Sequence, residues 1–357
     1  MKKIVGFILF LLVSSVCFAN SDPVVSNVSV IQRNDSKMVD ISYNLSDADG
    51  DKCTVSVQVS SDGGSTWTVP AVSFTGAVGA NISSGNGKLI VWDAGKDQPG
   101  VSWNNCRIKV TAFDNYGPTG MVWVYINDPG VSGHEPFNGY MSKYETTNSP
   151  YCQYLNVAKA SNQITVYNNV VYATSDTNHS QPYYNLVGSG YTYDGATNGG
   201  AARINWNGGS FTVDSGFESH PVTYVSWYGA MAFCNYYGYR LPTEWEWQAV
   251  ADHYGEFTYG CGTTINSSIA NHWNSIHPKG TVIVGSFGNS SGYGYGVVDM
   301  AGNVWEWTST IVFYDSVGHR VFCGGGWFSI DSSSTVSTWT HHYPNYMEPS
   351  VGFRVCR

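Results

Sequence analysis

The chain has 357 residues and a formal net charge of −9 at pH 7. This negative charge argues against nucleic acid and anionic membrane surfaces as partners. Only 12% of the residues are charged, about half of the usual share, whereas 15% are aromatic and 40 are glycine. This composition is typical of a rigid, turn-rich extracellular protein, and the length allows two domains.

The N-terminus has the pattern of a secretory signal peptide. Two lysines precede an apolar run, Ile4 to Phe18. Small residues, Cys17 and Ala19, occupy the two positions that a signal peptidase recognises before its cleavage site. The run is shorter than the roughly 20 residues that a membrane-spanning helix needs. We therefore expect a signal peptide over residues 1–19, a secreted protein and no membrane anchor. Lipid attachment at Cys17 is the alternative.

Residues 22–130 have the pattern of an all-β sandwich of the immunoglobulin or fibronectin type. Short alternating runs are separated by turn clusters, and no helical period occurs among them. The cluster from Asp47 to Asp51 is interpreted as a solvated turn, because a calcium loop would need a differently placed glycine and a closing glutamate. The predicted strands cover residues 25–32, 38–45, 53–61, 88–94, 106–113 and 121–128.

Removal of the signal peptide would leave seven cysteines, most of which should pair in an oxidising compartment. Cys53 and Cys106 each open a predicted strand, so one disulfide between them is expected.

In the second predicted domain, residues 135–357, the pattern of short alternating strands gives way to helical patterns and irregular segments. A helix is expected from Ser149 onward, with Pro150 at its first position. A second helix should begin at Ser226 and end at Gly238, with Cys234 facing inward. A third should begin with a capping box of Thr243 and Glu246. Most of the remainder is rich in Gly, Asn, Ser and Tyr and has few regular periods.

Five motifs of this domain, taken in their order along the chain, resemble those of one known family. They are MSKYETTNSPYCQYLN (141–156), HPVTYVSWYGAMAFCNYYGYRLPTEWEWQAVA (220–251), GYGVVDMAGNVWEW (294–307), GGGWFS (324–329) and GFRVCR (352–357). In this order they resemble the formylglycine-generating enzyme, or sulfatase-modifying factor, family. The resemblance implies a C-type-lectin-like α+β fold with little regular secondary structure, joined here to the N-terminal sandwich.

The resemblance also implies a calcium site in the GNVWEW loop. Its expected ligands are Asp299, Gly302, Val304 and Glu306, through side-chain and main-chain oxygens. Calcium takes six to eight hard oxygen ligands, and a bound ion would compensate the charge of a buried Glu306. Pairing of Glu306 with an arginine or with backbone amides is the alternative.

The family's copper site, by contrast, is expected to be absent. The two cysteines that hold copper(I) in the family correspond here to Ser329 and Ser334. Copper(I) is soft and prefers thiolates, whereas hydroxyl oxygens are hard and neutral. We therefore expect no copper and no oxidase activity of the family type, and no catalytic residue is assigned.

Two further disulfides are considered. Cys234 and Cys356 match a family disulfide, although Cys356 lies one residue later than in the family pattern. Cys261 and Cys323 could form a replacement bridge. Both pairings are hypotheses, because six cysteines allow fifteen connectivities.

The segment from Trp327 to Ser350 is dense in Trp, Tyr, His, Ser and Thr, residues that suit adaptable binding surfaces. The candidate ligand surface consists of Trp327, Trp339, His341, His342 and Tyr343, although its aromatic residues could equally belong to the core. A histidine metal site that also draws on His272, His277 and His319 is a weaker hypothesis, because no pair has a helical ligand spacing.

Two functions follow from these patterns. The preferred one is a secreted, calcium-stabilised recognition module for a protein or carbohydrate ligand, with the sandwich as a spacer or adhesion module. The alternative is a divergent metal-dependent oxidase of the same group.

Overall fold

The computed structural model describes residues 23–48, 50–64, 67, 69–114, 117–130, 135–189, 191–193, 196–273, 280–287, 294–314 and 318–357. The predicted signal peptide, Asp49 and His277 lie outside these residues. Within the part of the chain that is described, no helix is both long and apolar enough to cross a membrane.

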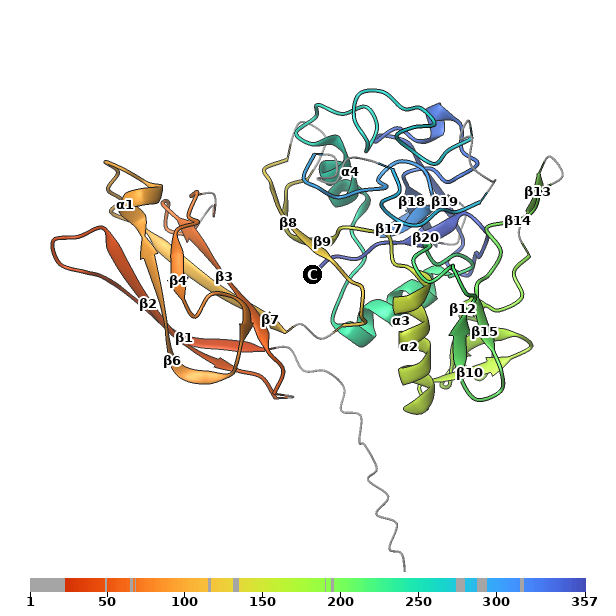
Figure 1. Ribbon diagram of the computed structural model, residues 1–357, viewed down its shortest axis with the longest axis horizontal. Coiled ribbons are helices and arrows are strands. Elements are labelled where there is room, and N and C mark those ends of the chain that lie inside the picture. Colours follow the sequence, from red (N-terminus) through yellow and green to blue (C-terminus); the bar gives the residue numbers. More distant parts are fainter. Residues whose placement is uncertain are drawn as a thin grey trace, which may run out of the picture.

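The N-terminal part consists of antiparallel β-sheets, as predicted, and Figure 1 shows it as a separate body of strands. One sheet has the order β1-β2-β6-β4 and the other β5-β3-β7. Side chains from both sheets form one core, including Ile41, Val55, Trp92 and Val110. The strands are β1 (Val24–Gln32), β2 (Met38–Ser46), β3 (Cys53–Ser60), β4 (Phe74–Gly76), β5 (Gly79–Ile82), β6 (Gly85–Asp93) and β7 (Arg107–Asp114), and a short helix α1 (Ala94–Asp97) follows β6.

The register of β3 and β7 excludes the predicted disulfide between Cys53 and Cys106. The two strands are antiparallel, with Cys53 opposite Asp114 and Ser60 opposite Arg107. Cys106, which directly precedes Arg107, therefore lies at the far end of the pair, roughly 20 Å from Cys53 at the usual rise per residue. A disulfide needs Cα atoms within about 7 Å. The prediction was wrong because both cysteines open their strands, and the strands run in opposite directions.

The last predicted strand of the sandwich belongs to the second domain instead. This strand, β8 (Trp123–Asp128), pairs along its length with β9 (Phe137–Ser142). Its Ile126 is buried in one cluster with Met141 and Trp247. The structural boundary therefore falls between β7 and β8 rather than near residue 130. An alternating pattern identifies a strand but not the sheet that it joins.

In its described residues the second domain combines three helices with several small sheets around an aromatic core. Its largest sheet has the order β19-β18-β17-β20, in which β17 and β20 are parallel. The helices are α2 (Asn148–Ala160), α3 (Trp227–Tyr237) and α4 (Glu244–Asp252), with a 3₁₀ turn η1 (Asp331–Ser333). The remaining strands are β10 (Ile164–Tyr167), β11 (Val170–Ala173), β12 (Pro182–Asn185), β13 (Tyr191–Tyr193), β14 (Ala196–Gly199), β15 (Ile204–Trp206), β16 (Phe211–Val213), β17 (Trp305–Phe313), β18 (Gly318–Cys323), β19 (Trp339–His342) and β20 (Val351–Phe353).

The helix ends follow the local sequence signals. The Ser226 hydroxyl accepts a hydrogen bond from the Gly229 amide, and Gly238 ends α3 with a left-handed φ of 68°. Thr243 and Glu246 form the predicted capping box of α4. Helix α2, however, begins at Asn148, so Pro150 is its third residue and not its first.

Candidate functional site

The GNVWEW loop is a tight turn that leads into β17. Asp299 and Asn303 have positive φ angles of 58° and 61°, and Gly302 has a φ of 81°. A Cβ added at Gly302 would lie 2.2 Å from the main-chain oxygen of Asn271. Only glycine therefore fits this position, both for its backbone angle and for the close approach of Asn271.

Glu306 lies at the centre of a buried network of charges. Its carboxylate receives two hydrogen bonds of 2.6 Å from Arg354 and one of 2.7 Å from the indole of Trp247. Glu306 and Arg354 have no solvent exposure. Arg354 also donates to the main-chain oxygens of Ser142 and Val298. The arginine pairing that the sequence left open is thus present, and it joins β17 to the chain just after β20.

Two more buried carboxylates surround this ion pair. Glu145 accepts hydrogen bonds from the Asn303 side chain at 2.6 Å and from the Val304 amide at 3.0 Å. The carboxylate of Asp299 accepts one from the Gly285 amide at 2.6 Å. Burial, reinforced by the nearby charges of Asp299 and Glu306, raises the pKa of Glu145 well above its usual value. Burial also raises the pKa of Asp299 to about 6.

The charges of this cluster fit a divalent cation. When all three carboxylates are ionised, they and the one guanidinium leave an excess of two negative charges, which burial makes unfavourable and which the raised pKa values of Glu145 and Asp299 reflect. Glu306 Oε1 accepts one hydrogen bond, from Arg354, and a carboxylate oxygen has two lone-pair positions. Among the described residues no three His, Cys, Asp or Glu side chains converge as a metal site. A calcium ion here would therefore depend on main-chain oxygens as well, as the resemblance predicts.

The sequence did not single out Glu145, Trp247 or Arg354. All three lie within the motifs that carry the family resemblance, but their roles depend on contacts with β17 and the loop before it. Glu145 and Val304, for example, are 159 positions apart. The position of Arg354 in the GFRVCR motif was the one sequence feature that could have identified it as a site residue.

Ser329 and Ser334 lie inside the protein on either side of η1. Ser329 is 6% exposed, Ser334 is fully buried, and the Ser329 hydroxyl accepts a hydrogen bond of 2.9 Å from the Gly326 amide. The nearest cysteine in sequence, Cys323, ends β18. Burial, followed by the charges of Glu244 and Glu306, raises the pKa of Cys323 and so disfavours its thiolate. These residues offer poor ligands for copper(I).

All seven cysteines of the described chain are unbridged in the structure. Cys234 and Cys356 are fully buried, and burial, followed by the proximity of Cys356, raises the pKa of Cys234. Their pairing stays a prediction that this proximity makes reasonable. The pairing of Cys261 with Cys323 stays a prediction as well; both residues are buried.

The aromatic–histidine surface is formed by side chains of β18 and β19 and of the residues beside them. Tyr314 is 78% exposed and Trp339 is 42% exposed. The Nδ1 atoms of His319 and His341 are 2.9 Å apart, so one ring donates a hydrogen bond to the other. We define this surface by Tyr314, Trp339, His341, His342 and Tyr343, which lie around the buried His319.

Two candidate residues lie elsewhere: Trp327, which the sequence grouped with the ligand surface, and His272, which it grouped with the histidine metal site. Trp327 is 2% exposed, and its indole donates to the main-chain oxygen of Pro349, so it is a core residue and not a ligand contact. The aromatic composition of the segment could not reveal which rings point inward. His272 is buried and pairs with Asp331 at 3.1 Å, whereas His319, His341 and His342 come together.

The motifs, the low content of regular structure and the buried loop together point to one family. A model of the sulfatase-modifying factor enzyme 1-like domain matches residues 134–357. The chain belongs to this family. As a sulfatase-modifying factor domain, residues 134–357 include the GNVWEW loop and Arg354, and Ser329 and Ser334 stand where the motif resemblance places the copper ligands of the family.

Relatives of this sulfatase-modifying factor domain have diverse names. The chain is 32% identical over 147 residues to the inactive C-alpha-formylglycine-generating enzyme 2 of Bos taurus, covering 38% of this chain and 49% of the bovine protein. It is 31% identical over 173 residues to the serine/threonine-protein kinase pkn1 of Chlamydia caviae, and this match covers 44% of this chain and 27% of the kinase. The match thus spans half or less of these relatives. The crystal structure of CarF is 19% identical, with a TM-score of 0.48, and the match covers 68% of this chain and 99% of CarF.

Proposed function

We propose that this protein is a recognition module that lacks the copper-dependent oxidase activity of its family. The observation that carries this proposal is the pair of serines, Ser329 and Ser334, where the family places its copper thiolates. Both hydroxyls are buried, and neither can supply the soft anionic ligand that copper(I) prefers. The similarity to a bovine protein named as inactive is consistent with this proposal.

A calcium ion stabilises the recognition module in this proposal. Asp299, Glu306 and the main-chain oxygens of Gly302 and Val304 would hold the ion. Its charge would compensate the two excess negative charges of the buried cluster, so the loop would keep its shape without protonation of a carboxylate.

The ligand contacts the aromatic–histidine surface. Exposed Tyr314, Trp339 and Tyr343 offer large contact areas at a low entropic cost, and the imidazoles offer hydrogen bonds. This chemistry suits a protein or carbohydrate ligand. The proposal includes export of the protein through its N-terminal signal. The N-terminal sandwich then acts as a spacer or adhesion module of the immunoglobulin or fibronectin type.

The test is conversion of a Cys-x-Pro-x-Arg sulfatase peptide to the aldehyde by the copper-loaded protein, followed by mass spectrometry. An active enzyme of the family serves as positive control. We expect no conversion and no copper retained after dialysis. The S329C/S334C double variant should retain copper(I), because it restores two thiolates. Conversion by the unmodified protein would overturn the proposal and favour the divergent oxidase.

A further inference from the structure

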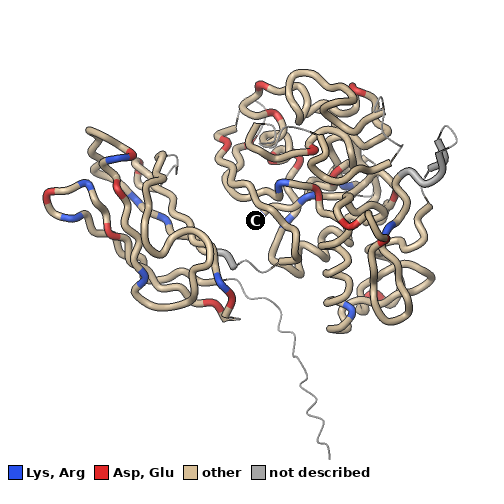
Figure 2. Tube along the Cα trace, viewed as in Figure 1, with Lys and Arg blue, Asp and Glu red and all other residues tan. Residues whose placement is uncertain are grey.

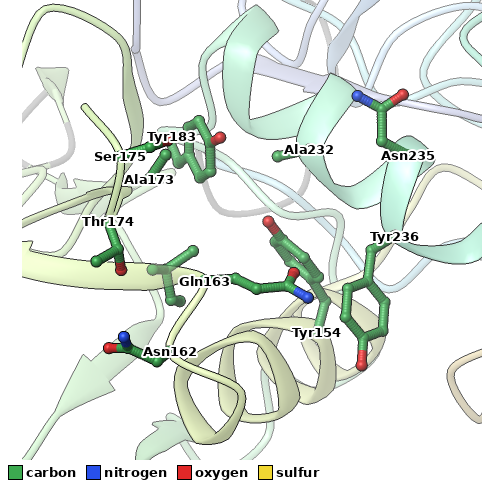
Figure 3. A pocket seen from close by; sticks show the side chains of 11 residues that line it. Tyr154, Asn162, Gln163, Ala173, Thr174, Ser175, Tyr183, Ala232, Asn235 and Tyr236 are labelled. Carbon is green, nitrogen blue, oxygen red and sulfur yellow. The ribbon is translucent and has the colours of Figure 1, made fainter. Parts of the chain in front are cut away.

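A hollow of about 660 Å³ lies between α2, the β10–β11 hairpin and α3. Figure 3 shows its lining, with the side chain of Gln163 beside Tyr154 and with Tyr183 beside Ser175. None of its lining residues belongs to the aromatic–histidine surface or to the carboxylate cluster. Its volume lies within the usual range for sites that hold small molecules.

The lining of this hollow carries no charge. All of its side chains are tyrosine, amide, hydroxyl or aliphatic groups. The hollow therefore offers no cation for a phosphate, sulfate or carboxylate and no anion for an amine. Figure 2 shows that charged positions are sparse along the second domain as a whole. A ligand of this hollow should itself be neutral.

Several polar side chains line the hollow. They are the amides of Asn162, Gln163 and Asn235, all three on exposed residues, and the hydroxyl of Tyr154. Each amide has both a donor and an acceptor end, as a ligand hydroxyl has. Asn162 has a left-handed φ of 57° and follows the C-cap of α2, Ser161.

Aromatic rings give the hollow a rigid floor. Tyr154 is 2% exposed, and its ring packs against Phe233 and Tyr236 at centroid distances of 5.8 and 5.6 Å. Ile164 is also buried at the base. The half-buried rings of Tyr183 and Tyr236, which also line the hollow, offer an apolar surface against which the C–H face of a sugar can pack.

We propose that this hollow binds a neutral oligosaccharide. A neutral sugar presents hydroxyls that both donate and accept, together with an apolar face, and the amides and tyrosines supply the complement to each. This site is separate from the aromatic–histidine surface, so the inference goes beyond the proposed function.

The test is isothermal titration of the full chain with neutral trisaccharides built from glucose, mannose, galactose and N-acetylglucosamine. At least one should bind, whereas a trisaccharide of uronic acids should not. Gln163→Ala and Tyr154→Phe should each weaken binding about two- to tenfold, the usual effect of one hydrogen bond. Neither change alters the backbone contacts of the hollow. Gln181→Ala, an exposed glutamine outside the lining, is the matched control and should bind as the unmodified chain does.

Three results would overturn the inference. They are the absence of binding of every neutral probe at millimolar concentration, equal binding of the uronic acid probe, or unchanged affinity in both variants of the hollow. Trp339→Ala separates this site from the proposed function. It should leave the titration unchanged, and a loss of sugar binding in that variant would place the sugar on the aromatic–histidine surface instead.

Discussion

Replacement of Arg354 by methionine should strongly destabilise the second domain. Arg354→Met keeps much of the side-chain volume but removes the only cation that contacts Glu306 among the described residues. It also removes donors from the main-chain oxygens of Ser142 and Val298. Breaking one partner of a buried ion pair costs about 3–5 kcal/mol. For a domain of this size, that corresponds to a fall in melting temperature of roughly 6–20 °C.

The assay is urea unfolding of the full chain, followed by near-ultraviolet circular dichroism. Arg203→Met provides the matched control, because Arg203 pairs with Asp214 at 3.5 Å in a partly exposed position of the same domain. A pair of that kind contributes about 1 kcal/mol or less. If the two variants unfold within about 1 kcal/mol of each other, the guanidinium does not hold the carboxylate cluster together, and the reasoning fails.

Three further predictions concern the loop, the metal and the histidines. Gly302→Ala should lower the free energy of unfolding by at least about 2 kcal/mol, because alanine would need a positive φ and its Cβ would clash with the main-chain oxygen of Asn271. A melting curve like that of the unmodified chain would contradict this geometry. Chelation by EDTA should lower the melting temperature and added calcium should restore it, whereas an unchanged curve would remove calcium from the proposal. Burial lowers the pKa of His342 in the folded state, so the unfolded chain binds more protons near pH 6 and stability should fall as the pH decreases through about 6.5. His342→Gln should flatten that pH dependence in thermal melts, and an equal slope in both proteins would assign it to other groups.

Local signals in the sequence predicted the local structure well. The capping box of Thr243 and Glu246 and the stop at Gly238 depend on residues within one helical turn, and all are present. The family motifs likewise located the buried loop before β17. In each case the interacting groups lie close together in the chain or are fixed by the family pattern.

Predictions that depended on distant contacts were less successful. Cys53 and Cys106 were paired because both open strands, but the antiparallel register separates them. The strand β8 alternates like its predecessors but pairs with β9. Trp327 and Trp339 belong to the same aromatic-rich segment, yet one is buried and the other exposed. Glu145 received no role because its partners lie about 160 positions away.

The position of Arg354 near the end of the described sequence affects when the core of the second domain can pack during synthesis. Glu145, Asp299 and Glu306 emerge from the ribosome before their arginine, and β20, which pairs with β17, comes only just ahead of it. Until residue 354 is available, a compact domain would enclose three carboxylates without the guanidinium that pairs with Glu306. The free-energy penalty for enclosing them favours an open chain until that point. Packing around these three carboxylates should therefore be a late step, completed after residue 354 has been made.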